Sequence, residues 1–142
     1  MGSVLEASVE LKNEKIMFEG TADGLPPVVT DYVPPLGDGK GYMPLQVFLI
    51  SLASCLGGTI APLLRRMGKN IGGLTISARG MRREQHPTGF EKITLKIRLV
   101  SDNATDEDLQ KVVSLAEQTY CPIWSMIKNN VEISSEFDIV RS

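Results

Sequence analysis

The sequence of 142 residues is poor in the side chains that most metal and hydrolase sites require. It contains one histidine and two cysteines, and neither a CxxC nor an HExxH motif occurs. One imidazole and two thiols do not complete a zinc site without a carboxylate. The Gly-x-Ser-x-Gly motif of many serine hydrolases is absent as well. We therefore expect neither a metal site nor Ser-His-Asp chemistry.

The chain also lacks a strong net charge. Seventeen acidic and fifteen basic side chains give a net charge of −2, so the whole chain has no electrostatic reason to bind nucleic acid or anionic lipid. The charge is uneven, with −4 over residues 1–40, +7 over 41–100 and −5 over 101–142. The basic centre could bind an anion. We favour the alternative that the fold brings surfaces of unlike charge together.

A secretory signal is not visible at the start of the sequence, because residues 1–6 lack a basic segment followed by an apolar run. Gly2 is a possible myristoylation site, but that motif requires Ser or Thr where Glu6 stands. We expect a cytoplasmic protein. In that compartment, two cysteines separated by 66 positions fit transient redox chemistry better than a structural disulfide.

A long uncharged segment covers residues 41–64 and is followed at once by two arginines. Its length is enough to span a bilayer, but it contains two prolines and several polar residues, and its strongly apolar part covers only 47–56. We expect a buried helix of a soluble protein rather than a membrane span. This helix should begin near Pro44 and bend or break just after Cys55, where a Gly-Gly pair and a proline follow.

Strands are predicted on both sides of this helix, because apolar and polar residues alternate there. Thr105 and Asp108 form a capping box that should start a second helix, which Cys121-Pro122 interrupts before a further helical segment. The order of elements predicts a single α+β domain over 1–142, with strands in hairpins rather than a doubly wound parallel sheet. The expected strands lie around 9–11, 16–18, 28–33, 74–79, 93–99 and 131–139.

The two cysteines, Cys55 and Cys121, are the candidates for chemistry. Both could be small buried hydrophobic residues. However, Cys121 precedes Pro122 and should occupy the N-cap of a helix, where amide dipoles stabilise a thiolate. Cys55 stands directly before the Gly-Gly pair, where the lack of side chains would let a substrate approach closely.

Three segments together resemble the OsmC/Ohr proteins, the osmotically inducible and organic hydroperoxide resistance proteins. They are PLQVFLISLASC at 44–55, RRMGKNI at 65–71 and AEQTYCPI at 116–123. With the order of elements, the resemblance covers nearly the whole chain. It implies an OsmC-like fold, with antiparallel sheets around a long buried central helix. It also implies an intertwined homodimer with its active sites at the dimer interface.

The resemblance further implies a thiol-dependent peroxidase. Cys55 matches the peroxidatic cysteine, which attacks an organic hydroperoxide and becomes a sulfenic acid, and Cys121 matches the resolving cysteine, which condenses with it to a disulfide. A dithiol reductant, a lipoylated protein in the best-known members, would then reduce the pair. This chemistry needs no metal, flavin or other cofactor, and it involves no nucleic acid or membrane partner.

The chain departs from the family's peroxidases at two points. They carry a glutamate just after the proline of the central motif, where this chain has Leu45 and then Gln46. They also use an arginine from the N-terminal region to stabilise the thiolate, whereas no arginine precedes Arg65 here. Gln46 could supply a hydrogen bond at the site. The candidate replacement cations are Lys15, Lys40 and Arg79.

Two other functions remain as alternatives. The fold could serve as a binding protein with inert cysteines, holding an apolar ligand beside the helix face of Leu49, Leu52 and Leu56. It could also be a redox sensor or sulfur-transfer protein that forms the disulfide but turns over slowly. If the protein only binds a ligand, its thiol count should stay unchanged after excess peroxide. If it is a sensor or sulfur-transfer protein, the disulfide should form but the rate of turnover should be low.

Overall fold

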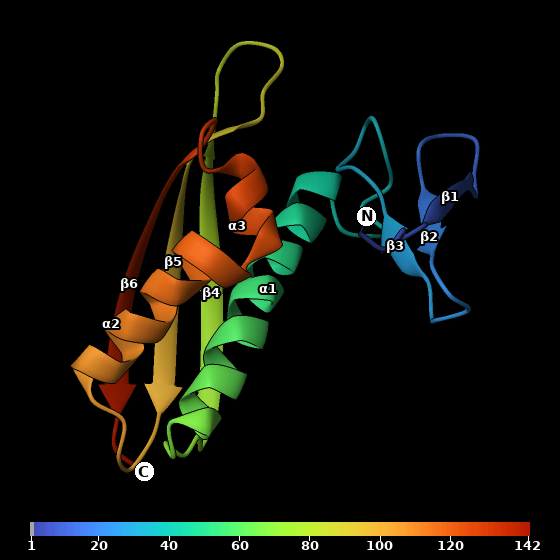
Figure 1. Ribbon diagram of the computed structural model, residues 1–142. Coiled ribbons are helices and arrows are strands. Elements are labelled where there is room, and N and C mark those ends of the chain that lie inside the picture. Colours follow the sequence, from blue (N-terminus) through green and yellow to red (C-terminus); the bar gives the residue numbers. More distant parts are fainter. Residues whose placement is uncertain (1) are drawn as a thin grey trace. The chain divides into compact units, whose positions relative to one another are not determined.

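The computed structural model describes residues 2–142, which divide into two compact units (Figure 1). The first unit ends at Phe48 and the second runs from Leu49 to Ser142, and each is described by itself. The α+β class predicted from the sequence is confirmed. The elements in chain order are β1 (Ser8–Leu11), β2 (Phe18–Thr21), β3 (Val28–Thr30), α1 (Pro44–Arg66), β4 (Gly73–Arg82), β5 (Phe90–Val100), α2 (Asp106–Leu115), the π-helical turn η1 (Ala116–Tyr120), α3 (Pro122–Ile127) and β6 (Glu132–Val140).

The first unit contains an antiparallel sheet in the order β1-β2-β3. The third strand ends at Thr30 and not at residue 33 as predicted, because the chain turns around the side chain of Asp31. This carboxylate is fully buried and accepts backbone N–H bonds from Tyr32 at 2.8 Å, Asp38 at 3.2 Å and Lys40 at 3.1 Å. The loop of residues 31–40 is therefore built around one carboxylate.

Burial raises the pKa of Asp31, but the three backbone N–H donors more than offset this effect, so the pKa lies below its ordinary value. The loop also leaves no room for a side chain at Gly37. An added Cβ there would overlap the Asp31 carboxylate and the carbonyl of Tyr32. The glycine is thus required by a close approach of backbone to the buried acid.

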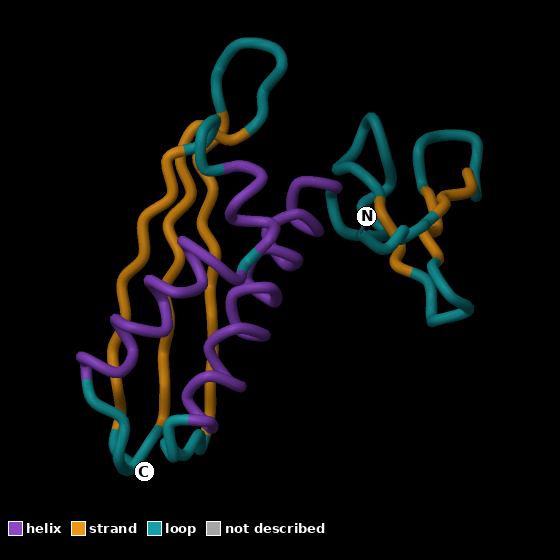
Figure 2. The backbone as a smooth tube through the Cα atoms, viewed as in Figure 1, coloured by secondary structure: helices purple, strands orange, loops and turns teal. Residues whose placement is uncertain are grey.

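The second unit contains a three-stranded sheet in the order β4-β5-β6. Strands β4 and β5 form the predicted antiparallel hairpin, but β6 pairs with β5 in parallel, so the expectation of purely antiparallel sheets is wrong. A parallel neighbour requires a long crossover, which residues 101–131 supply through α2, η1 and α3. Figures 1 and 2 show these helices and the second half of α1 on one face of the sheet, while the other face carries no helix.

The core of this unit lies between the helices and the sheet. Strand β5 shows the alternation that the sequence predicts, with fully buried apolar side chains at every second position and Lys or Arg between several of them. Helix α1 contributes a stripe at four-residue spacing. The fully buried side chains of these two elements are Leu52, Leu56, Ile60, Leu64, Ile93, Leu95, Ile97 and Leu99.

Helix α1 continues without interruption from Pro44 to Arg66, so the predicted break after Cys55 is wrong. Pro62 lacks the N–H group that would bond the carbonyl of Gly58. Because both of these residues are exposed, water can bond that carbonyl, and the helix tolerates the proline. By length and composition α1 could cross a membrane, yet part of its most apolar window, 28%, is buried within the protein.

Helix α2 begins at the predicted capping box. The hydroxyl of Thr105 accepts the N–H of Asp108, and the Asp108 carboxylate accepts the N–H of Thr105. The helix then widens into the π-helical turn η1, which the sequence does not predict. The N–H of Cys121 closes this turn on the carbonyl of Ala116 at 2.9 Å, which positions Cys121 between η1 and α3.

Candidate active site

The two cysteines lie together in the second unit. Helix α1 carries Cys55, and the junction of η1 and α3 carries Cys121. The thiol of Cys121 donates a hydrogen bond to the sulfur of Cys55, with 2.9 Å between the two Sγ atoms, and both cysteines are free. Cys121 is 1% exposed, whereas Cys55 is half-buried. Of the two sulfurs, that of Cys55 is therefore the more accessible to a substrate.

The environment of Cys121 favours its protonated form. Burial and the interaction with Cys55 raise the pKa of the Cys121 thiol to about 11, although the N–H groups of Trp124 and Ile123 act in the opposite direction. The predicted N-cap position is confirmed. The expected stabilisation of a Cys121 thiolate by the amides at the start of α3 is present, but burial of the sulfur outweighs it, so the pKa is raised and not lowered.

An apolar hollow of about 430 Å³ lies beside this part of α1. Ser54, the residue before Cys55, lines it together with Gly57 of the same helix and Ile76 of β4. A Cβ at Gly57 would stand 3.3 Å from Cδ1 of Ile76, so the glycine allows α1 and β4 to approach closely. The remaining lining residues are Ile50, Ala53 and Leu74. The hollow suits an apolar group better than a charged one.

The predicted supporting residues of the first unit have local partners. The side chain of Gln46 accepts the N–H of Met43 at 2.9 Å and so caps the start of α1. Lys15 forms an ion pair with Asp38 at 2.7 Å. Lys40 donates its backbone N–H to Asp31 and lines a separate hollow of about 570 Å³ within this unit.

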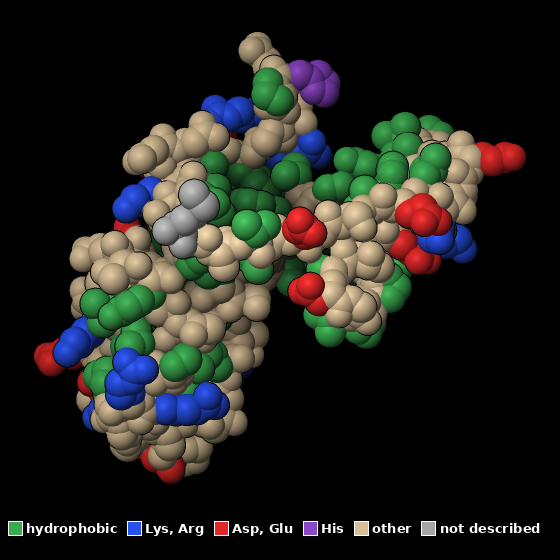
Figure 3. All heavy atoms as spheres, turned by 45° about the vertical axis from the view of Figure 1, so that its right-hand side comes forward, with side chains coloured by type: hydrophobic (Ala, Val, Ile, Leu, Met, Phe, Trp, Pro, Cys, Tyr) green, Lys and Arg blue, Asp and Glu red, His purple; other side chains and the backbone are tan. Residues whose placement is uncertain are grey.

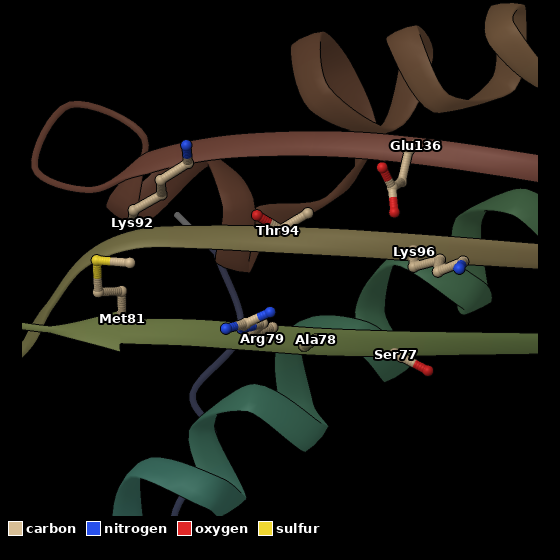
Figure 4. A pocket seen from close by; sticks show the side chains of 8 residues that line it. All are labelled: Ser77, Ala78, Arg79, Met81, Lys92, Thr94, Lys96 and Glu136. Carbon is tan, nitrogen blue, oxygen red and sulfur yellow. The ribbon is translucent and has the colours of Figure 1, made fainter.

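Arg79 is the predicted supporting residue of the second unit. It alternates along β4 with Ile76, Ala78 and Gly80, which are partly buried, and it lies on the face of the sheet that carries no helix (Figure 4). Within one chain the structure therefore brings Cys55 and Cys121 together and leaves Arg79 apart from them.

We also searched the surroundings of the thiols for a metal site. Among residues 2–142, no three His, Cys, Asp or Glu side chains are grouped so that they could hold a metal ion. Sequence reasoning missed the apolar hollow and the turn η1. The close approach at Gly57 was the one signal for the hollow, since a glycine inside a long helix often marks a packing contact.

Comparison with known proteins identifies the family. The model of the OsmC-like proteins matches residues 37–136. The chain belongs to the OsmC-like family. Solved structures of similar fold include a protein from Aquifex aeolicus VF5 (24% identity, TM-score 0.87, 99% of each chain covered) and an OsmC-like protein from Mycoplasma pneumoniae (20% identity, TM-score 0.85, 99% of each chain covered).

The OsmC-like fold also relates the chain to organic hydroperoxide resistance proteins. The protein OhrB of Bacillus subtilis has 20% identity and a TM-score of 0.64, with 96% of this chain and 98% of that chain covered. A search of the curated proteins found no match. At these identities the solved structures show a shared fold, and the chemistry must be argued from this chain's own residues.

Proposed function

We propose that this OsmC-like protein is a thiol-dependent peroxidase that reduces organic hydroperoxides, with Cys55 as the peroxidatic cysteine and Cys121 as the resolving cysteine. The observation that carries the proposal is the 2.9 Å between the two sulfurs, which come from distant segments of the chain. A disulfide bond is about 2.05 Å long, so less than about 1 Å of movement separates the dithiol from the oxidised pair.

The first step consumes the peroxide. The thiolate of Cys55 attacks the terminal oxygen of the hydroperoxide, a sulfur–oxygen bond forms and the oxygen–oxygen bond breaks. Cys55 becomes a sulfenic acid, and the leaving alkoxide takes up a proton to give the alcohol. The hydrogen bond from Cys121 keeps the sulfur that will resolve the intermediate beside the sulfur that attacks.

The second step forms the disulfide. The sulfur of Cys121 attacks the sulfenic sulfur of Cys55, and the departing hydroxide leaves as water with the proton of Cys121. Part of the rise in the pKa of Cys121 comes from Cys55, after the larger effect of burial. The electrostatic share of this effect requires a negative charge on Cys55, which the sulfenic acid no longer carries, so Cys121 should lose its proton more readily after the first step than before it.

A reductant must then restore both thiols by thiol–disulfide exchange. Because the buried sulfur is that of Cys121, exchange should begin at the more accessible Cys55. A small dithiol, free or carried as a lipoyl group on a protein, can reach such a site and release itself by forming its own disulfide.

The proposed substrate is an organic hydroperoxide with an apolar body. This substrate class rests on the likeness of the chain to the organic hydroperoxide resistance proteins. The apolar hollow beside Ser54 is lined by neither cysteine, so it is not used here to hold the substrate against Cys55. The same hollow supports the alternative of an apolar-ligand-binding protein, which predicts that the thiols survive excess peroxide.

The proposal includes a cytoplasmic homodimer of single OsmC-like domains. The sequence of helix α1 is mostly apolar, yet Ile50 on this helix is 53% exposed in a single chain. Figure 3 shows hydrophobic side chains on the surface of the first unit. A second copy of the chain would cover such surfaces. The exposed apolar residues of this unit include Val4, Leu5, Val9, Leu11, Leu25, Val28, Val33 and Leu36.

The test uses two cysteine variants with different expected outcomes. Cys55→Ser should abolish consumption of cumene hydroperoxide, because the attacking sulfur is lost. Cys121→Ser should consume one equivalent and stop at the sulfenic acid, which dimedone traps. Unchanged peroxide consumption by folded Cys55→Ser would overturn the assignment. The thermal transition and the elution volume of each variant serve as controls for folding.

A further inference from the structure

The helix-free face of the second sheet contains a hollow of about 550 Å³ (Figure 4). Arg79 of β4 and Lys92 and Lys96 of β5 line it. The hydroxyl groups of Ser77 and Thr94 are also part of the lining. Three cations and two residues with hydroxyl groups thus lie around one hollow, whose volume is within the range of small-molecule sites.

The strand register places Arg79 at the centre of this group. Arg79 lies directly opposite Thr94 on β5. Lys92 and Lys96 stand two residues to either side of Thr94 on the same face of the strand, so they are the diagonal neighbours of Arg79. The ammonium groups of both lysines therefore repel the guanidinium of Arg79. Strand β4 lies at the edge of this sheet, with β5 as its neighbour.

The acidic side chains of β6 only partly balance these cations. Glu132 lies 3.8 Å from Lys92, and Glu136 lines the hollow opposite Lys96 in the register. Within residues 2–142, no carboxylate lies within ion-pair distance of Arg79 or Lys96. The lining side chains comprise three positive charges and one negative charge, a net of +2.

We propose that this hollow binds a phosphate monoester of a small organic molecule, with its phosphate group at Arg79. A phosphate monoester carries a charge between about −1.5 and −2 at neutral pH and three strong acceptor oxygens. The guanidinium can donate two parallel hydrogen bonds to two of these oxygens. The lysines act as flexible point charges on either side, and the hydroxyl groups supply further donors.

The hollow also accommodates an organic part of the ligand. Met81 and Ala78 are among the residues that line it, on the same strand as Arg79 (Figure 4). A thioether adapts its shape to different apolar groups. A monoanionic carboxylate would leave most of the positive charge unbalanced, so it should bind more weakly than the dianion.

This site does not depend on the proposed peroxidase. It lies on the face of the sheet opposite the helices, and neither cysteine lines it. The substitution Cys55→Ser should therefore leave binding at the hollow unchanged. Failure of one proposal leaves the other standing.

The test is a titration of the ¹⁵N-labelled protein with phenyl phosphate at low ionic strength, followed by two-dimensional NMR. We expect saturable shifts of the amide signals of Arg79 and Thr94. Arg79→Gln should weaken binding by about tenfold, because it removes a charge-assisted bidentate contact. Arg98→Gln is the matched control, since Arg98 lies on the same face but outside the hollow, and it should change affinity by less than about twofold.

Four outcomes would overturn the proposal, three of them the phosphate site itself and the last its organic ligand. The first is the absence of saturable shifts at these amides. The second is an equal loss of affinity in Arg79→Gln and Arg98→Gln, which would indicate attraction to the general charge of the face. The third is equal or tighter binding of benzoate than of phenyl phosphate. Tighter binding of phenyl phosphate than of inorganic phosphate would support the organic part of the ligand, and equal binding would overturn it.

Discussion

The thiol of Cys121 donates a hydrogen bond to the sulfur of Cys55 across 2.9 Å, although 66 positions separate the two residues in the sequence. The donor is buried and keeps its proton, and the acceptor is the more exposed sulfur. This asymmetry assigns different chemical roles to two otherwise identical side chains.

Selective alkylation follows from this asymmetry. With a pKa of about 11, about one in a thousand Cys121 side chains is a thiolate at pH 8. Iodoacetamide at pH 8 should therefore label Cys55 in the native reduced protein and leave Cys121 unmodified. Peptide mass mapping reads out both sites. Equal labelling of the two cysteines in folded protein would contradict the assignment, and equal labelling in denaturant is the expected control.

Replacement of Cys121 separates its role as a donor from its role in the disulfide. Cys121→Ala removes both the donor and the resolving sulfur, whereas Cys121→Ser keeps a hydroxyl donor and loses only the sulfur. Because the hydrogen bond holds the sulfur of Cys55 in place, Cys121→Ser should consume its single equivalent of cumene hydroperoxide faster than Cys121→Ala. Single-turnover rates of the two variants provide the measurement. Identical rates would show that the hydrogen bond is irrelevant.

The site was predictable from the sequence only in part. The resemblance paired Cys55 with Cys121, and the proline after Cys121 predicted its N-cap position. The rise in the pKa of Cys121 was not predictable, because it results from burial by segments distant in sequence. The turn η1 before it has no residue pattern of its own, since i→i+5 bonding depends on packing rather than on a particular side chain.

The fold, like the site, differs from the prediction where tertiary structure and not a local pattern decides. The alternation of β5 and the capping box at Thr105 are local signals, and both are confirmed. The parallel pairing of β6 depends on the path of the whole crossover, which no local pattern encodes. The donors of Asp31 come from an irregular loop up to nine residues further on, so neither period of two nor period of 3.6 reveals them.

The buried carboxylate of Asp31 should stabilise the first unit in a pH-dependent way. Its pKa is lowered in the folded protein, so its contribution is complete above the ordinary value of 3.8 and is lost as the pH falls through the folded value. Asp31→Asn should lower the melting temperature at pH 7, and the difference from the parent protein should shrink towards pH 3.

Thermal unfolding at several pH values, read by circular dichroism, measures this effect. Asp23→Asn is the matched control, because Asp23 is exposed in the same unit and asparagine tolerates its positive φ of 55°. A constant difference between Asp31→Asn and the parent across the pH range would refute the role of the carboxylate charge.

The exposed side of α1 should hold two copies of the chain together. Ile50→Glu places a charge on this apolar surface and should convert the dimer into monomers. Met81→Glu introduces the same charge at a similarly exposed residue on the helix-free face of the sheet, and it should leave the dimer intact. Sedimentation velocity at micromolar concentration distinguishes the two results. A parent protein that sediments as a monomer would contradict the dimer.

The most direct test of the account is stopped-flow consumption of cumene hydroperoxide by the fully reduced protein, with thiol counts and intact masses from the same samples. We expect rapid loss of two thiols per chain, a mass decrease of two hydrogens from a Cys55–Cys121 disulfide, and slower reaction with hydrogen peroxide. Survival of both thiols after excess cumene hydroperoxide would contradict the peroxidase and favour the apolar-ligand-binding function.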